Sequence, residues 1–114
     1  KLLMAAQVLR FFPAYDSLKT WVESGACGEM RLATFRRRCA APDWAPWLKD
    51  KSQSGGGVFD LLIHDIDMAL YLFGNPVKVS SSGCEDLANG VDVIQGRLYY
   101  EDFSVAIMGG WHPG

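Results

Sequence analysis

The segment from Val58 to Phe73 is the feature that most constrains the fold of this chain. Three consecutive glycines precede it, Gly74-Asn75-Pro76 follows it, and it contains neither glycine nor proline. Glycine and proline at both ends mark helix boundaries, so the sequence predicts one long helix here. Apolar side chains surround most of that helix, which is typical of a helix buried inside a domain. The domain is therefore expected to be built around it.

Three polar side chains interrupt this apolar surface along a single line. Asp60, His64 and Asp67 are spaced i, i+4, i+7, and at about 100° per residue they fall within an arc of about 60°. Asp65 is the charged residue elsewhere on the helix. Unpaired burial of such groups is costly, so the three either face a solvent-filled cleft or satisfy one another. Both arrangements allow the tuned pKa values that general acid–base chemistry requires.

The pattern supports two interpretations of this polar stripe with equal weight. In the catalytic one, Asp60 lies one turn before His64, fixes the imidazole tautomer and stabilises the imidazolium. In the structural one, Asp60 offsets the helix dipole, His64 bonds a backbone carbonyl and Asp67 pairs with an arginine. A metal-dependent hydrolase is a third hypothesis, disfavoured because His112 is the only other histidine and structural zinc sites rely on cysteine or several histidines.

The triple glycine offers a candidate ligand contact. Glycines before a helix let the backbone approach a ligand, and a helix N-terminus favours negative charge. Gly56 and Gly57 are therefore candidate contacts for a cofactor phosphate, and the alternative is a flexible helix cap. The chain contains no G-x-G-x-x-G fingerprint and no P-loop, so it does not supply a complete phosphate-binding motif.

Aromatic and basic residues ahead of the helix are the remaining candidates. Trp44 and Trp47 are placed to stack on a sugar face, and packing in the core or a lid is equally consistent with them. Within the run Arg36-Arg37-Arg38, Arg37 is the candidate for binding an anionic substrate, whereas its two neighbours are expected to be solvated.

The remaining elements give an α+β fold, with the central helix packed on an open, mainly antiparallel sheet. A second helix is expected from Pro13 to Gly25, and residues 40–54 are expected to form a long loop. The expected strands are Leu2 to Leu9, Glu29 to Cys39, Val77 to Ser82, Asp92 to Tyr100 and Phe103 to Gly109, the last two forming a hairpin. The open face of the sheet is expected to expose residues such as Ile94, Tyr100 and Ile107 and to make a homo-oligomer interface.

Composition excludes several classes of protein. The chain has 114 residues, 49% hydrophobic and 21% charged, with a net charge of -2. This is one globular domain or part of one, and it has no general attraction to nucleic acid or anionic membranes. The apolar run Leu2 to Leu9 is too short to span a bilayer and lacks a signal-peptide cleavage site. Three widely spaced cysteines predict free thiols and a cytoplasmic location.

Several of these motifs together resemble the Gfo/Idh/MocA oxidoreductase family. The triple glycine, the stripe of Asp60, His64 and Asp67, and the run from Leu72 to Val77 resemble the signature of that family's second domain. Weaker similarities occur in the same order along the chain: Arg10 to Pro13 with Tyr15, Gly25 to Glu29, Arg37 to Trp47, and Trp111.

The resemblance implies an NAD- or NADP-dependent enzyme that transfers hydride between nicotinamide and a sugar- or cyclitol-like hydroxyl or carbonyl. His64 would be the general acid/base, Asp60 its catalytic partner and Asp67 a contact to substrate hydroxyls. Both ends of the chain look cut. Residues 1–12 would end a Rossmann domain that binds most of the cofactor, residues 13–114 would form part of the C-terminal domain, and this fragment alone is expected to be inactive. The alternative is a non-catalytic oligomerisation or binding module of the same fold.

Overall fold

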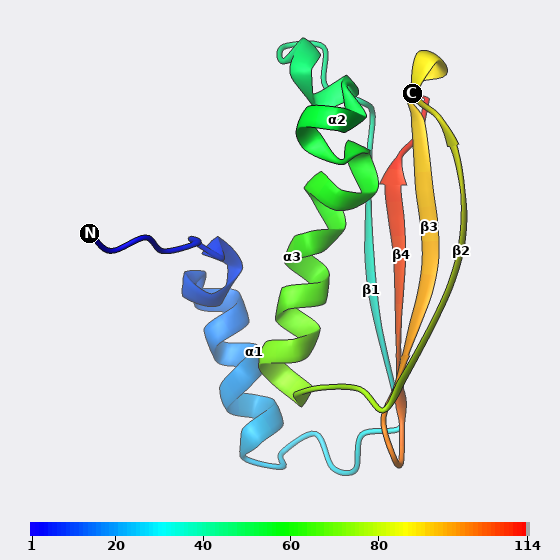
Figure 1. Cartoon of the computed structure of the whole chain (residues 1–114). Helices are drawn as coiled ribbons and strands as arrows, with labels where there is room; N and C mark the ends of the chain where they lie inside the picture. Colours follow the sequence, from blue (N-terminus) through cyan, green and yellow to red (C-terminus); the bar gives the residue numbers. More distant parts are fainter. Residues whose placement is uncertain (114) are drawn as a thin grey trace.

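The computed structural model describes residues 1–113 and consists of helices on one side of a sheet (Figure 1). Its longest element is α3, Gly56–Phe73, and α1, Pro13–Glu23, lies beside it. The strands are β1 (Leu32–Cys39), β2 (Lys78–Asp86), β3 (Val91–Tyr99) and β4 (Ser104–Trp111), and the short helices are η1 (Val8–Phe11), η2 (Pro46–Lys49), α2 (Lys51–Ser54) and η3 (Leu87–Asn89). The expected α+β class, with a central helix on an open sheet, is confirmed.

Across residues 1–113 the strands form one sheet in the order β1-β4-β3-β2. β2 with β3 and β3 with β4 are antiparallel, as expected, and the β3–β4 hairpin is present. β1 is parallel to β4, so the sheet is mixed. A parallel pair needs a long crossover connection, and here the chain between the two strands includes α3, β2 and β3.

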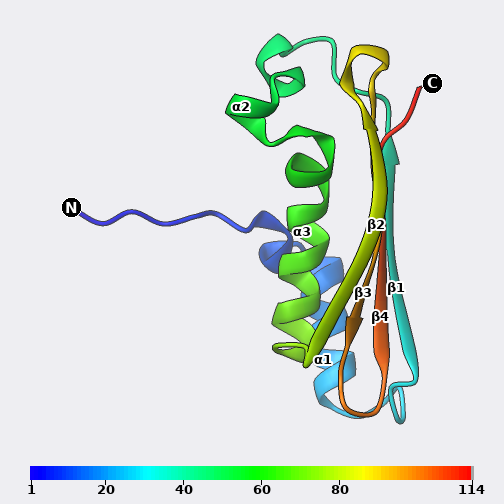
Figure 2. The same ribbon diagram turned by 45° about the vertical axis from the view of Figure 1, so that its right-hand side comes forward.

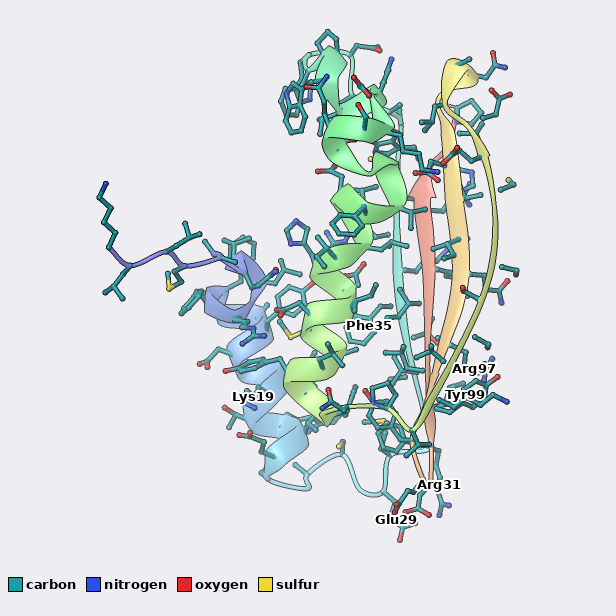
Figure 3. The ribbon with its side chains drawn as sticks, viewed as in Figure 1. Lys19, Glu29, Arg31, Phe35, Arg97 and Tyr99 are labelled. Atoms are coloured by element: carbon teal, nitrogen blue, oxygen red, sulfur yellow. The ribbon has the colours of Figure 1, made fainter. Side chains whose placement is uncertain are left out.

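Side chains from α3 and from one face of the sheet make the core. Leu62 and Ala69 of α3 are buried together with Val105 and Ile107 of β4. Phe35 of β1 points into the space between helix and sheet (Figure 3). These buried apolar groups are the main source of stability in a domain of this size, at about 1.5–3 kcal/mol for each fully buried side chain.

The opposite face of the sheet is uncovered by any described helix (Figure 2). The expectation that Ile94, Tyr100 and Ile107 lie on this face is wrong, because all three pack in the core beneath α3. Strand side chains alternate between faces, so the open face carries their neighbours, among them Arg36 and Arg38, and Arg97 and Tyr99 labelled in Figure 3.

Several expected element boundaries differ from the structure, and residues 40–54, expected to form a long loop, contain η2 and α2. Leu2 to Leu9 forms no strand: Leu2 and Leu3 are fully exposed and η1 takes up the end of the segment. A strand needs a neighbour to pair its backbone groups, and no described strand lies alongside this segment. β1 begins at Leu32 rather than at Glu29. β2 continues to Asp86, where a loop was expected, because β3 pairs with the whole length of β2.

Close packing explains the glycines that begin α3. Gly56 has φ +87°, and a Cβ there would overlap the carboxylate of Asp92, while a Cβ on Gly57 would overlap the Trp111 ring. Asp92 is buried and accepts a hydrogen bond of 2.9 Å from the backbone N–H of Val58. The carboxylate thus occupies the positive end of the helix. The glycines allow that end to lie directly on β3 and β4.

We expect Gly57→Ala to destabilise the full-length protein by about 1–3 kcal/mol, the usual cost of overpacking a well-filled core. The added methyl group would have to displace the buried indole of Trp111. Chemical denaturation measures the effect. Gly96→Ala is the matched control, because a Cβ there meets only ordinary van der Waals neighbours. Equal stability of the two variants would contradict this account of the glycine run.

Candidate active site

The polar stripe on α3 lies on the side of the helix that faces away from the sheet. Leu62 and Ala69 contact the sheet, and at about 100° per residue they are roughly half a turn from His64 and its neighbours on the stripe. Asp60, His64 and Asp67 are each half-buried. The residues that surround them come from η1 and from the segment between β1 and α3.

Asp67 forms an ion pair with Arg10 of η1. The Arg10 Nε donates to Asp67 Oδ2 at 2.8 Å, and a second guanidinium nitrogen donates to Oδ1. The hydrogen bond to Asp67 raises the pKa of Arg10 above its usual value. The Arg10 guanidinium also lies 4.7 Å from the centre of the Tyr71 ring, a cation–π distance. The arginine partner considered for Asp67 in the structural interpretation is therefore present.

The imidazole of His64 has a buried nitrogen that finds no partner among residues 1–113. Its Nδ1 is enclosed and makes no hydrogen bond within the part of the chain that the structure describes. The expected hydrogen bond from His64 to Asp60 is not formed among these residues. A buried polar atom without a partner is unusual in a folded protein and calls for a specific reason.

Asp60 instead lines a hollow of about 430 Å³ beside the helix. Cys39 at the end of β1 and the ring of Trp47 line the same hollow. Trp47 is 52% exposed and Trp44 is 81% exposed, so both rings are open to a ligand. Burial raises the pKa of the Cys39 thiol above its usual value, and the negative charge of Asp60 raises it further.

Arg37, the expected contact to an anionic substrate, is bound to Asp65 of α3. Its Nε and a terminal nitrogen donate to the two carboxylate oxygens at 2.9 and 2.8 Å. These hydrogen bonds raise the pKa of Arg37. The guanidinium, whose side chain is 32% exposed, is thus held by Asp65, and its contact with an anionic substrate stays a prediction. Arg36 and Arg38 are exposed, as expected.

Gly56 and Gly57, the candidate cofactor contacts, lie at the packed start of α3. Both are buried, and the helix N-terminus that they begin is occupied by the Asp92 carboxylate. A phosphate at this position would meet the negative charge of Asp92. The glycines therefore serve the packing of α3 on β3 and β4 rather than a flexible cap, and a cofactor contact through them stays a prediction.

Two further structural findings concern metal binding and membrane spanning. Within residues 1–113, no group of three or more His, Cys, Asp or Glu side chains is placed to hold a metal ion. No helix of that range has the length and apolar character needed to cross a membrane.

Sequence reasoning missed the charged partners that enclose the stripe. Arg10 was noted only for its similarity to a family segment, Asp65 only as an exception on the helix, and Asp92 not at all. Strand alternation is the signal that could have found Asp92, and also the burial of Arg37, the partner of Asp65. Arg37 shares the inward phase of Phe35, and Asp92 shares that of Ile94, so each places a charge on the covered face, where it needs a partner.

Comparison with known proteins identifies the family. Residues 15–109 match the profile of the GFO/IDH/MocA C-terminal domain, so the chain belongs to the Gfo/Idh/MocA oxidoreductase family. It is 36% identical over 73 residues to D-glucoside 3-dehydrogenase of Escherichia coli (strain K12), covering 62% of this chain and 21% of that protein. It is 32% identical over 81 residues to inositol 2-dehydrogenase of Rhizobium meliloti (strain 1021), covering 70% of this chain and 24% of that protein. The chain thus spans about a quarter or less of these relatives.

Solved structures confirm the fold. Aldose-aldose oxidoreductase from Caulobacter crescentus, complexed with glycerol, superposes with a TM-score of 0.82 at 22% identity, over 97% of this chain and 35% of that one. A myo-inositol dehydrogenase from Corynebacterium glutamicum gives a TM-score of 0.72 at 28% identity, over 90% of this chain and 32% of that one. The arrangement of α3 on its sheet is therefore that of the family's C-terminal domain.

The Cys39 thiol is expected to report the charge of Asp60. Removing that charge in Asp60→Asn lowers the Cys39 pKa, so more thiolate is present at neutral pH and alkylation by iodoacetamide is faster. Mass spectrometry of the full-length protein measures the rate. Cys84, exposed on β2, is the internal control and should react unchanged. An unaltered Cys39 rate would show that Asp60 does not act on this thiol.

Proposed function

We propose that the full-length protein is an NAD- or NADP-dependent oxidoreductase that transfers hydride between nicotinamide and a carbon bearing oxygen on a sugar- or cyclitol-like substrate. The observation that carries the proposal is the unpartnered, buried Nδ1 of His64 on the polar stripe of α3. Membership of an oxidoreductase family supports it, as do relatives that include a D-glucoside dehydrogenase and an inositol dehydrogenase.

In the proposed reaction, His64 handles the proton. Oxidation of an alcohol to a carbonyl releases a hydride from carbon and a proton from oxygen, and the imidazole takes the proton. Asp60 lies about one helical turn away. The structure shows no hydrogen bond between Asp60 and His64 within residues 1–113, so Asp60 supports the imidazolium through its negative charge alone. The nicotinamide supplies the hydride acceptor, and its binding is assigned to a domain outside this chain, because the start of α3 is filled by Asp92.

Substrate contacts are proposed at two places around His64. Asp67 and its partner Arg10 present a carboxylate and a guanidinium at the same point, which suits a hydroxyl that both donates and accepts hydrogen bonds. Trp47, half-exposed on the hollow that Asp60 lines, offers an apolar platform for the face of a sugar ring. Three free cysteines support a reducing, cytoplasmic location.

We also propose that the full-length protein is a homo-oligomer that associates through the open face of the sheet. No described helix covers this face (Figure 2), and it contains a hollow of about 430 Å³ lined in part by Arg36, Val93 and Met108. An uncovered sheet face with apolar side chains at its centre is a typical contact surface.

Val93→Arg is expected to weaken this association, because it adds a charge to a face that already carries Arg36 and Arg38. Sedimentation of the full-length protein over a range of concentrations measures the effect. Thr20→Glu, on the exposed surface of α1, is the control and should leave the oligomer unchanged. A wild-type protein that stays monomeric at high concentration would remove the proposal.

His64→Ala in the full-length enzyme is expected to lower kcat by about 100-fold or more, the usual contribution of a positioned acid or base. Asp60→Asn should also lower kcat, because the charge that supports the imidazolium is lost. Steady-state kinetics with a D-glucoside and with an inositol measures both effects. Binding of NAD and NADP should be unchanged in either variant, since His64 and Asp60 lie outside the proposed cofactor domain.

Asp67→Ala is the comparison variant for this test. If Asp67 holds a substrate hydroxyl in the ground and transition states alike, its loss raises KM at least as much as it lowers kcat. Near wild-type kcat in folded His64→Ala would show that the stripe is structural and would end the catalytic assignment.

A further inference from the structure

We infer that the ion pair between Arg37 and Asp65 is a positioning device that sets the orientation of His64 for the proton transfer. This inference rests on the proposed function of His64. Asp65 is the next residue along α3, and Arg37 lies in β1. The pair therefore joins the helix to the sheet at the level of the imidazole.

The Asp65 carboxylate is buried, with a side chain only 4% exposed, while that of Arg37 is 32% exposed. Both carboxylate oxygens accept hydrogen bonds from one guanidinium. Replacing a buried ion pair with apolar side chains of similar volume often leaves stability unchanged or raises it. Stability of the fold alone therefore does not account for a charged pair at this place.

Geometry indicates what the pair adds. The contacts of Leu62 and Ala69 beneath α3 are apolar and non-directional, so they resist small rotations of the helix only weakly. Two parallel hydrogen bonds between guanidinium and carboxylate have a defined geometry. They fix the rotation of α3 about its axis and its height above β1. The His64 ring, about 100° further round the helix, is carried with that rotation.

The sheet has a glycine in β4 beside Arg37 of β1. Arg37 is paired in register with Gly109 of β4. Gly109 has φ +150°, and a Cβ there would overlap the backbone of Arg37. Glycine therefore allows β4 to approach β1 closely at Arg37, which fixes the backbone from which the guanidinium extends to Asp65.

The first test is Asp65→Asn in the full-length enzyme. The asparagine keeps the shape of the side chain but cannot accept two charge-assisted hydrogen bonds from Arg37. A misplacement of about 1 Å costs up to about 100-fold in rate, so we expect kcat to fall by about 10- to 100-fold while KM for the substrate changes less. Arg37→Lys keeps the positive charge but loses the two-pronged geometry, and it should also lower kcat.

A double variant separates positioning from stability. Arg37→Met with Asp65→Leu removes both charges and should recover the thermal stability lost in either single variant. If the pair positions His64, kcat stays low although the melting temperature recovers. If kcat recovers together with the melting temperature, the pair is merely structural and the inference is overturned.

A readout independent of turnover completes the test. The rate of His64 modification by diethyl pyrocarbonate, measured by mass spectrometry, depends on the surroundings of the imidazole. It should change in the stable double variant, whereas the rate at His112 should not. Glu85→Gln breaks the exposed ion pair between Glu85 and Lys51, and this control should alter neither kcat nor the His64 rate.

The two proposals fail in different ways. An unchanged kcat in His64→Ala removes the proposed function, whatever Asp65→Asn does. A low kcat in His64→Ala, combined with wild-type kcat and wild-type His64 modification in the double variant, leaves the proposed function standing and removes the positioning role. If no substrate is turned over, an unchanged His64 modification rate in the double variant still overturns the inference.

Discussion

A helix that is apolar over most of its surface must be enclosed, and α3 has to be enclosed without burying an unpaired charge. The sheet covers one side through Leu62 and Ala69. The carboxylates of Asp65 and Asp67 are matched by Arg37 and Arg10, which come from β1 and η1. Each partner belongs to an element far away in the sequence. The requirement to pair these charges therefore ties the helix to both of its flanks.

Asp92 extends the same principle to the end of the helix. It is buried on β3, yet its charge meets the backbone N–H of Val58 and the positive end of the helix dipole. Gly56 and Gly57 have no side chains to keep that carboxylate and Trp111 away. The position of α3 is thus defined at its start by Asp92 and near its middle by Asp65. Between these two fixed points lie Asp60 and His64.

Local patterns in the sequence were enough to predict α3, its end at Gly74, the β3–β4 hairpin and the grouping of Asp60, His64 and Asp67 on one face. Each of these depends on periodicity or on glycine and proline positions. The parallel pairing of β1 with β4 depends on contacts between distant segments, which no local pattern contains. The same holds for the partners of Asp65 and Asp67. Leu2 to Leu9 shows the converse error, because apolar residues alone predicted a strand that has no partner strand within residues 1–113.

The parallel pairing of β1 with β4 has a consequence for the order of folding. Leu32 pairs with Ser104 and Cys39 with Trp111. β1 can therefore pair with β4 only after β4 has been synthesised. β2, β3 and β4 are consecutive and antiparallel, and they can form together through contacts that are close in sequence. On this topology we expect β1 to pair with β4 after β2, β3 and β4 have come together. Because Arg37 lies on β1, the charge on Asp65 would then gain its partner in that closing step.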